Sequence, residues 1–388
     1  MKVYGFSVPF EFPLHFTSGV FDRGNQLLAS VVARLEPSRR HRLLVVIDER
    51  VASANPYLQD AVLGYASAHA DVIELVGPPL IVMGGEAVKN DIAHALAVMR
   101  AINDAGIDRQ SFIVAVGGGA VLDMVSFAAA IAHRGIRVVR LPTTVLAQAD
   151  SGVGVKNSIN MFGKKNFAGT FVPPFAVIND LDFLETLEPR DRIAGIVEAV
   201  KVAVLKDAAF FDDIALNASR VAHDNLVLRR VIERSAELHL QHICGSGDPF
   251  ELGSARPLDF GHWAAHKLES MTHHRLRHGE AVAIGIALDV AYSVRKGFLA
   301  PATGTRVINV LETIGLPLWD DAIEQRERDG SHTLLAGLRE FREHLGGELH
   351  ITLLRNIGES FEVTEMDAAV ILESIEELSR MRPANIGR

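Results

Sequence analysis

The chain has 388 residues, 48% hydrophobic and 22% charged, a balance typical of one or two globular domains. Its net charge of -9 argues against broad nucleic-acid binding, and its single cysteine, Cys244, excludes an internal disulfide and a cysteine-rich metal site. No apolar run reaches the roughly 18 residues of a membrane span, and prolines and charges interrupt the N-terminus, so neither a membrane helix nor a signal peptide is expected. We therefore expect a protein of the reducing cytoplasm with a small-molecule partner.

The first half of the chain alternates short apolar runs with amphipathic helical patterns. Each run ends at, or is followed by, a glycine, a proline or an acid, and the runs cover residues 42–48, 80–83, 111–116, 136–141 and 175–179. Continuous β-branched runs separated by helices predict a parallel sheet that helices cover on both faces. Ligands of such sheets collect at the carboxyl ends of the strands, so we expect binding residues in the loops that follow them.

After about Glu185, helical periodicity dominates, and only residues 350–354 have the pattern of a strand. No internal repeat or low-complexity segment interrupts the chain. We therefore predict an α/β, Rossmann-like domain with a parallel sheet at 1–184 and a mainly α-helical domain at 185–388.

A glycine-rich turn, Gly117-Gly118-Gly119, lies between a predicted strand and a predicted helix. Glycines let the backbone approach a ligand, and the free N–H groups of a helix start favour an anion, which indicates a pyrophosphate site. The spacing is not G-x-G-x-x-G, so a tight turn without a ligand is the alternative. Asp48 and Glu86 end or follow strands and are candidates for binding ribose hydroxyls, although ordinary loop acids would give the same pattern.

Residues 142–171 form a polar, glycine-laced stretch that we expect to be a loop. Lysine charge and amide donors can wrap a phosphate, and a solvated loop is the alternative. The polar residues of interest in this stretch are Thr143, Thr144, Asp150, Lys156, Lys165 and Asn166.

The second half holds a group of potential metal ligands. His262 and His266 lie one turn apart on one face of a predicted helix, and His278 opens the next helix. Glu198 and Lys201 lie three residues apart on the first helix of the second domain. Imidazoles and a carboxylate suit zinc or cobalt, although histidines at this spacing also occur on ordinary helices. The pattern is not H-E-x-x-H, which disfavours a zinc protease.

Six segments, taken in chain order, resemble the dehydroquinate synthase superfamily of sugar phosphate cyclases. They are GGGAVLDMVSFAAAIAHRG, LPTTVLAQADSGVGVK, GKKNFAGTF, GIVEAVK, DFGHWAAHKLE and RHGEAVAIG. The resemblance runs from about Asp48 to Ile357. It implies a Rossmann-like N-terminal domain, a helical C-terminal domain, bound NAD, a divalent metal and a homodimer.

The resemblance also implies a role for each matching residue. The metal ligands would be Glu198, His262 and His278, and the residues that face the substrate would be Asp150, Lys156, Lys201 and His266. Lys165, Asn166 and Arg134 would bind the substrate phosphate, with Arg134 a candidate to reach across a dimer. The NAD-binding set would be Asp48, Glu86, Lys89, Gly118, Gly119, Asp123, Thr143, Thr144, Lys156, Lys165, Phe183 and Thr186.

The segment before His262 departs from dehydroquinate synthase, where it is similar to R-x-L-L-N-x-G-H. Here the arginine falls on Ala255, the asparagine falls on Asp259, and a lysine found further upstream falls near Gln241. Because arginine and lysine are the natural partners of a carboxylate, their loss disfavours the carboxylated substrate of that enzyme. Arg256 could take the place of the missing arginine, which keeps dehydroquinate synthase itself as an alternative.

A substrate without a carboxylate fits this pattern better. Residues 341–347 (FREHLGG) and the segment DSGVGVK are similar to cyclases that act on sedoheptulose 7-phosphate and make 2-epi-5-epi-valiolone or related cyclitols. We therefore expect a lyase that eliminates phosphate from sedoheptulose 7-phosphate, with Asp259 accepting hydrogen bonds from substrate hydroxyls. The alternatives are an NAD- and metal-dependent polyol dehydrogenase for the protein and an ordinary helix N-cap for Asp259.

Overall fold

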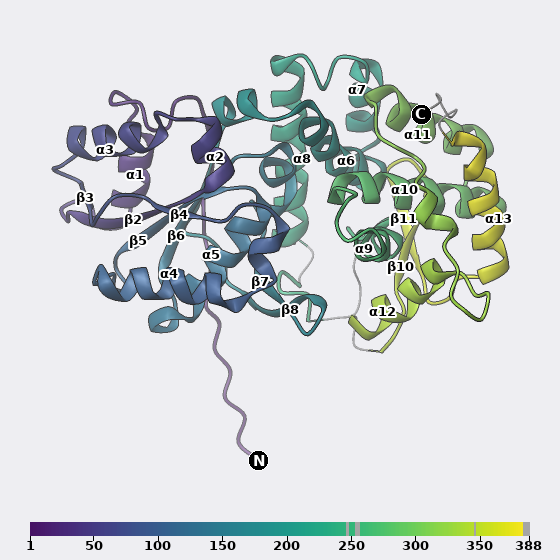
Figure 1. Cartoon of the computed structure of the whole chain (residues 1–388), viewed down its shortest axis with the longest axis horizontal. Coiled ribbons are helices and arrows are strands. Elements are labelled where there is room, and N and C mark those ends of the chain that lie inside the picture. The colour runs from purple at the N-terminus through teal and green to yellow at the C-terminus, as the bar shows by residue number, and fades with distance from the viewer. Residues whose placement is uncertain (246–247, 253–256, 345–346, 383–388) are drawn as a thin grey trace. The chain divides into compact units, whose positions relative to one another are not determined.

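The computed structural model of the protein describes residues 1–245, 248–252, 257–344 and 347–382. The chain divides into two compact units, Met1–Thr186 and Leu187–Arg388, so the division falls two residues beyond Leu184. The first unit is α/β and the second is mainly helical, which confirms the predicted fold class (Figure 1). In the described part of the chain, no helix is long and apolar enough to cross a membrane.

The first unit is built on a parallel sheet in the order β1-β9-β6-β5-β2-β3, with β4 also paired to β2. The strands are β1 (Leu14–Thr17), β2 (His41–Asp48), β3 (Ile73–Leu75), β4 (Leu80–Val82), β5 (Phe112–Gly117), β6 (Arg137–Pro142) and β9 (Ala176–Asp180). The five predicted runs form β2, β4, β5, β6 and β9. The short strands β1 and β3 escape prediction because they are mostly half-buried and lack a continuous apolar run.

Helices cover both faces of this sheet: α1 (Leu27–Ala33), α2 (Glu49–Ala54), α3 (Leu58–Ala68), α4 (Ile92–Asp104) and α5 (Gly119–Ile131). Along β2, Leu43, Val45 and Ile47 belong to the core that α1 and α3 complete, while Leu44 and Val46 belong to the core under α4 and α5. Both faces of the strand thus bury apolar side chains. This is why its sequence is a continuous apolar run instead of an alternating one.

The expectation of a loop over residues 142–171 is wrong. The segment contains a π-helical turn, Ala147–Ser151, and an antiparallel hairpin of β7 (Lys156–Met161) and β8 (Lys164–Phe171) that packs against α5. Buried positions of β7 carry the polar side chains Asn157, Ser158 and Asn160. Since its buried side chains include these polar ones, the strand lacks the apolar alternation by which strands are usually predicted.

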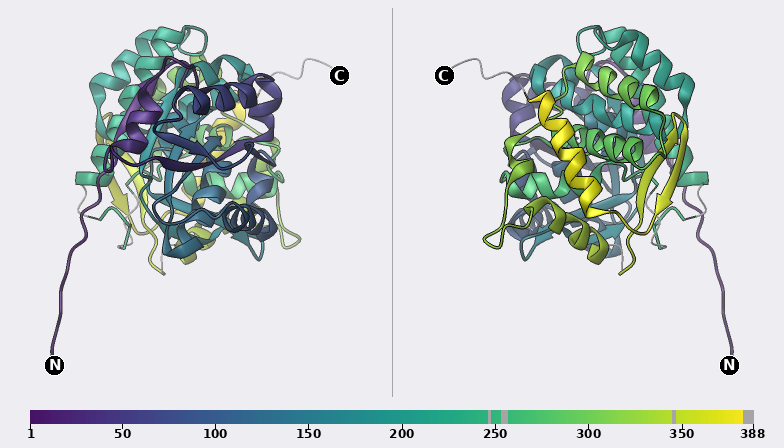
Figure 2. Two further views of the ribbon diagram at one scale, coloured as in Figure 1. Left: turned by 90° about the vertical axis from the view of Figure 1, so that its left-hand side faces the viewer. Right: turned by 90° about the vertical axis from the view of Figure 1, so that its right-hand side faces the viewer.

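The second unit is a cluster of helices with one small hairpin. The helices are α6 (Pro189–Lys206), α7 (Ala208–Asn217), α8 (Asn225–Gly245), α9 (His262–Met271), α10 (His278–Arg295), α11 (Pro301–Ile314), α12 (Ala336–His344) and α13 (Ala368–Leu378). The strand predicted at 350–354 is β10 (Ile351–Asn356), and it pairs with β11 (Glu359–Val363), which the sequence does not predict. Helix α10 is central: it contacts α6, α9, α11 and α13, and every residue from 279 to 293 is buried. Figure 2 shows α13 on the outside of this unit.

Glycines bring α10 into backbone contact with its neighbours. A Cβ atom on Gly279 would lie 1.9 Å from the carbonyl oxygen of Ala194 on α6. A Cβ atom on Gly285 would lie 2.0 Å from the carbonyl oxygen of Gly261, which precedes α9. Any larger residue at these positions would push the helices apart. The two contacts therefore fix how α6, α9 and α10 meet.

Candidate active site

Three side chains from α6, α9 and α10 converge inside the second unit. The ligand atoms of Glu198, His262 and His278 lie within 4.8 Å of one another. Glu198 Oε1 is 4.0 Å from His262 Nε2 and 3.5 Å from His278 Nε2. Two ligands that are each about 2.1 Å from one tetrahedral zinc ion are separated by roughly 3.4 Å. The spacing of this triad therefore suits a divalent metal ion.

Contacts on the far side of each imidazole orient it toward Glu198. His262 Nδ1 is 3.1 Å from the carbonyl oxygen of Phe260, and His278 Nδ1 is 3.1 Å from Glu269 Oε2. Each contact favours the tautomer with its hydrogen on Nδ1, which leaves the Nε2 lone pair for a metal. Burial lowers the pKa of His262, so its neutral, ligating form is favoured.

The predicted substrate-facing residues of this unit lie beside the triad. Lys201 Nζ is 2.6 Å from Glu198 Oε2, and both side chains are almost fully buried. The centre of the His266 ring is 5.5 Å from that of His262 and 6.2 Å from that of His278. An ammonium and a third imidazole therefore lie close to the candidate metal ligands, where proton transfer to a bound substrate would be needed.

Asp259 lies just before α9. Burial lowers the pKa of His262, and the nearby Asp259 carboxylate opposes that effect. The backbone carbonyl of Asp259 accepts a hydrogen bond from His262 N at 3.0 Å. The N-cap position itself belongs to Gly261, whose φ is 77°. The alternative that Asp259 is the N-cap of this helix is therefore wrong, and its charge lies near the triad.

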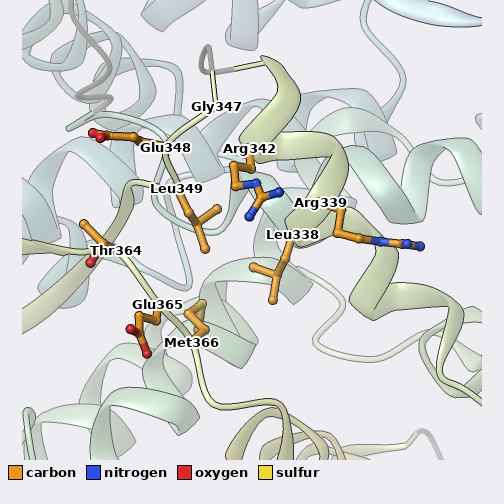
Figure 3. Close-up of a pocket in the computed structure, with 9 residues that line it drawn as sticks. All are labelled: Leu338, Arg339, Arg342, Gly347, Glu348, Leu349, Thr364, Glu365 and Met366. Carbon is orange, nitrogen blue, oxygen red and sulfur yellow. The ribbon is translucent and has the colours of Figure 1, made fainter.

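The structure describes only some of the other residues that bear on the substrate. Gln241 is exposed on α8, while Ala255, Arg256 and two residues of the FREHLGG segment, 345 and 346, lie outside the described residues. Arg342 and Gly347 of that segment line a cavity of about 640 Å³ (Figure 3). Its full lining is Leu338, Arg339, Arg342, Gly347, Glu348, Leu349, Thr364, Glu365 and Met366. Because none of these is a predicted site residue, we place the site at the triad instead.

Two buried acids behind the triad, Glu269 and Asp289, are absent from the predicted set of site residues. Glu269 lies on the same helix as His262, seven residues further on. Asp289 accepts hydrogen bonds from Gly261 N and Trp263 Nε1, both at 2.9 Å, on either side of His262. Burial raises the pKa of Asp289 to about 7. The one sequence signal for Asp289 is an acid in the middle of an otherwise apolar helix.

In the first unit, the predicted NAD-binding residues gather at the carboxyl edge of the sheet. They lie at or after β2 (Asp48), β4 (Glu86 and Lys89 in the short helix Glu86–Lys89), β5 (Gly118, Gly119 and Asp123), β6 (Thr143, Thr144, Lys156 and Lys165) and β9 (Phe183 and Thr186 in the short helix Leu181–Thr186). This is the edge at which ligands bind in open parallel sheets. Their role in binding NAD stays a prediction.

The start of α5 fits a pyrophosphate. Gly118 is the N-cap, so no side chain caps the first N–H groups of the helix. A Cβ atom on Gly119 would lie 2.6 Å from Ser151 Oγ, and one on Gly118 would lie 3.3 Å from Thr144 Cγ2. Thr143 Oγ1 is buried and has no hydrogen-bond partner among the described residues. A ligand at this edge would satisfy that hydroxyl.

Asp48 and Glu86, the candidates for binding ribose, are both held in place. Asp48 Oδ1 accepts from Arg50 N at 2.8 Å, and burial raises the pKa of this carboxyl group. A Cβ atom on Gly84 would lie 2.2 Å from Asp48 Oδ1, so a larger residue there would displace the acid from its present position. Glu86 Oε1 accepts from Asn160 Nδ2 at 3.0 Å, which ties the short helix after β4 to the hairpin.

Lys89 links the NAD-binding set to the phosphate-binding set. This lysine is 2% exposed, and its Nζ donates to Asp123 Oδ2 at 2.7 Å and to Asn166 Oδ1 at 2.5 Å. Ser158 Oγ donates to Asn166 Oδ1 at 2.9 Å, and Asn160 Oδ1 accepts from Asn166 N at 2.8 Å. Ser158 and Asn160 are absent from the predicted set, and their signal is a run of polar residues at alternate positions of β7.

The remaining predicted residues lie in two parts of the first unit, after β6 and before it. Asp150 lies in the π-helical turn, Lys156 begins β7 and Lys165 lies in β8, so all three belong to the segment after β6. π-Helical turns are frequent at functional sites. Arg134 is exposed and precedes β6, which puts it at the amino edge of the sheet. Within one chain it is not brought to the other phosphate-binding residues, and its action across a homodimer stays a prediction.

Comparisons with known proteins agree with this arrangement. The families described as "3-dehydroquinate synthase N-terminal" and "3-dehydroquinate synthase C-terminal" match residues 79–194 and 195–331. A 3-dehydroquinate synthase of Cereibacter sphaeroides is 34% identical over 368 residues, which cover 92% of this chain and 95% of that protein.

The solved structures that resemble the whole chain include two synthases. The 2-epi-5-epi-valiolone synthase ValA from Streptomyces hygroscopicus subsp. jinggangensis, solved with NAD⁺ and Zn²⁺ bound, superposes with a TM-score of 0.85 at 26% identity, covering 98% of this chain and 100% of that one. A 2-deoxy-scyllo-inosose synthase complexed with carbaglucose-6-phosphate, NAD⁺ and Co²⁺ gives a TM-score of 0.73 at 23% identity, covering 95% and 96%. The second likeness supports the fold alone.

Proposed function

The chain belongs to the dehydroquinate synthase family of sugar phosphate cyclases, and from this premise we propose that its substrate is sedoheptulose 7-phosphate. The product would be 2-epi-5-epi-valiolone or a related cyclitol, formed with elimination of phosphate. The likeness to ValA supports this choice, while the sequence relatives named 3-dehydroquinate synthase support the carboxylated substrate as the alternative.

The described residues fit both cofactors of the proposed reaction. Two imidazoles with their Nε2 atoms turned toward a buried carboxylate form a donor set suited to zinc or cobalt. The uncapped helix start and the buried hydroxyl of Thr143 suit NAD. When bound, the metal would polarise a substrate oxygen and NAD would accept and return a hydride.

One observation carries the choice of substrate: an acid, Asp259, lies near His262, where dehydroquinate synthase has an asparagine. A carboxylate on the substrate would be repelled by this charge, whereas hydroxyl groups would donate hydrogen bonds to it. Gln241, at a position that aligns near a lysine of that enzyme, carries no charge to offset the repulsion. The pair of changes favours a substrate without a carboxylate.

The chain's own residues would hold and orient the substrate phosphate. Asn166 Oδ1 accepts from both Lys89 Nζ and Ser158 Oγ, which turns the Asn166 Nδ2 donors toward another acceptor. That amide and the charge of Lys165 would stabilise the phosphate as its C–O bond breaks. An oxygen of the leaving phosphate would accept the proton from the neighbouring carbon. Binding both ends of the flexible chain would then favour ring closure by an intramolecular aldol step.

A direct assay tests the proposed function. With sedoheptulose 7-phosphate, the protein should release phosphate with a kcat/KM at least about tenfold above that for the carboxylated substrate of 3-dehydroquinate synthase. The absorbance of NADH should not change, because the hydride is returned in each turnover. A preference for the carboxylated substrate would establish the first alternative. Sustained NADH formation, stoichiometric with substrate, would establish a polyol dehydrogenase.

Asp259→Asn keeps the shape of the side chain and removes its charge. Phosphate release from sedoheptulose 7-phosphate should fall about tenfold or more, the effect of losing a hydrogen bond to a charged group. The melting temperature should change little, because the N-cap of α9 is Gly261. Asp329→Asn, in an exposed loop of the same unit, is the matched control. Unchanged activity in Asp259→Asn would remove the main support for the choice of substrate.

Lys165→Ala tests the phosphate-binding role of the hairpin. The affinity for inorganic phosphate should fall about tenfold, while the affinity for NAD should change less, since Lys165 is one member of a large NAD-binding set. Lys164→Ala is the control, because successive side chains of a strand point to opposite faces. Calorimetric titration of both ligands gives the comparison. An equal loss of both affinities would mean that Lys165 supports the hairpin or binds NAD instead.

A further inference from the structure

Arg140 is a buried cation in the first unit that none of the roles above uses. It lies on β6, is 1% exposed, and its Nε donates to Ser126 Oγ on α5 at 3.1 Å. Burial lowers the pKa of Arg140 to about 10, so the guanidinium stays charged near neutral pH. Burying a charged group costs free energy because the group loses its hydration. The hydrogen-bond partners of Arg140 must therefore offset this cost.

The other four N–H groups of Arg140 all meet one short stretch of chain, which we call the 152–157 segment. Nη1 donates to the carbonyl oxygens of Gly152 at 3.2 Å and Gly154 at 2.7 Å. Nη2 donates to the carbonyl oxygen of Lys156 at 3.4 Å and to Asn157 Oδ1. With Ser126, the five donors of the guanidinium have five acceptors. The planar guanidinium group thus donates hydrogen bonds to three alternate carbonyl oxygens of the segment, those of Gly152, Gly154 and Lys156.

The 152–157 segment joins two of the predicted substrate-facing residues. Asp150 lies in the π-helical turn just before it, and Lys156 lies within it at the start of β7. The turn is anchored separately, because Gln148 Nε2 donates to the carbonyl oxygens of Pro142 at 3.0 Å and Asp180 at 2.8 Å. Arg140 therefore helps to set the path of the chain from Asp150 to Lys156, together with the backbone hydrogen bond from Val172 N to the carbonyl oxygen of Val155 at 2.9 Å.

The charge of Arg140 is not neutralised by an adjacent acid. Its acceptors are carbonyls, a hydroxyl and an amide, and no carboxylate oxygen of the described residues lies within 4.0 Å of it. The acid whose charge acts on it is Asp123, which is already paired with Lys89 at 2.7 Å. These three groups together carry one surplus positive charge beside the hairpin. In a low-dielectric interior, such a charge attracts an anionic ligand.

We propose that Arg140 is a positioning residue that holds the 152–157 segment, so that Asp150 and Lys156 are set for the reaction, and that its charge helps to draw the phosphate-bearing substrate. The second half of this inference rests on the proposed function. The first half does not, because it concerns the backbone of the segment.

Two substitutions distinguish the role of the planar guanidinium group of Arg140 from the role of its positive charge. Arg140→Lys keeps the charge but has only three donors on one nitrogen for the five acceptors, and Arg140→Met removes both the donors and the charge. Arg137→Met, on the same strand, is the matched control, because Arg137 stacks near Phe112 and Phe175 and pairs with Glu36. Hydrogen exchange of backbone amides, the melting temperature, and kcat and KM for phosphate release from sedoheptulose 7-phosphate are measured on the NAD-loaded protein.

The amides of the 152–157 segment should exchange about tenfold faster in both Arg140 variants, and kcat should fall about a hundredfold. KM should rise about tenfold in Arg140→Met and remain near the wild-type value in Arg140→Lys, which retains the charge. Arg137→Met should show none of these changes.

Two results would overturn the inference: unchanged exchange in the segment of a folded variant, or a lower melting temperature with unchanged kcat. If Arg140→Met does not fold, Arg140→Lys alone decides the holding role. If the wild-type protein releases phosphate from neither sugar phosphate, the proposed function fails, and the exchange rates still decide whether Arg140 holds the segment.

Discussion

Replacing Glu198 with glutamine should abolish tight metal binding and lower phosphate release about a thousandfold. Glu198 supplies the carboxylate of the triad, and its Oε1 is the atom that both His262 Nε2 and His278 Nε2 approach. A neutral amide is a poor ligand for zinc or cobalt, and the polarisation of a substrate oxygen by a metal contributes several kcal/mol to catalysis. Metal content by mass spectrometry and a phosphate-release assay measure the two effects.

The control for this substitution is His274→Ala, which removes an exposed histidine four residues before His278. It should keep its metal and its activity. Chelation of the wild-type protein should reproduce the defect of Glu198→Gln, and added zinc or cobalt should reverse it in the wild type only. Full metal content in Glu198→Gln would show that the triad is not the metal site.

Stability of the metal-free protein should decrease as the pH rises from about 4 to about 7, because of Asp289. Burial raises the pKa of Asp289 from 3.8 to about 7. The folded protein therefore keeps a proton that the unfolded chain has released above pH 4. The stabilisation is complete below that pH and is lost as the pH rises through about 7. This rise in the pKa of Asp289 corresponds to a loss of stability on the order of 4 kcal/mol across that range of pH.

Asp289→Asn isolates this effect, since it has no carboxyl group to titrate. The free energy of unfolding in urea, measured at several pH values for both proteins without metal, gives the difference between them. The free energy of unfolding of Asp289→Asn minus that of the wild type should become more positive as the pH rises. Parallel curves for the two proteins would show that Asp289 titrates in its ordinary range in the folded state.

The sheet of the first unit could be predicted wherever both faces of a strand are apolar. The runs that become β2 and β5 are continuous for this reason, and they also locate the glycine turn and Asp48 at the carboxyl edge. The hairpin of β7 and β8 could not be predicted in the same way. Buried side chains of β7 include Asn157, which contacts Arg140, and Asn160, which contacts Glu86, so its pattern depends on partners far away in the sequence.

The sequence predicts those parts of the candidate site whose residues share a helix or a recognisable motif. His262, His266 and His278 fall within two adjacent helices, and the structure brings them together with Glu198. The supporting residues Asp289 and Arg140 could not be found by spacing. Their function depends on which backbone groups fold against them, and only the tertiary structure supplies those groups.

The backbone contacts of α10 have a consequence for how the protein tolerates mutation. Gly279 and Gly285 meet the main chain of Ala194 and Gly261, so the approach of the three ligand-bearing helices requires that these two positions have no side chain. Conservative changes among the apolar side chains around these helices should be tolerated more readily than any substitution at the two glycines. In a library of random variants, both glycines should therefore be nearly invariant, although neither has a side chain that could touch a metal or a substrate.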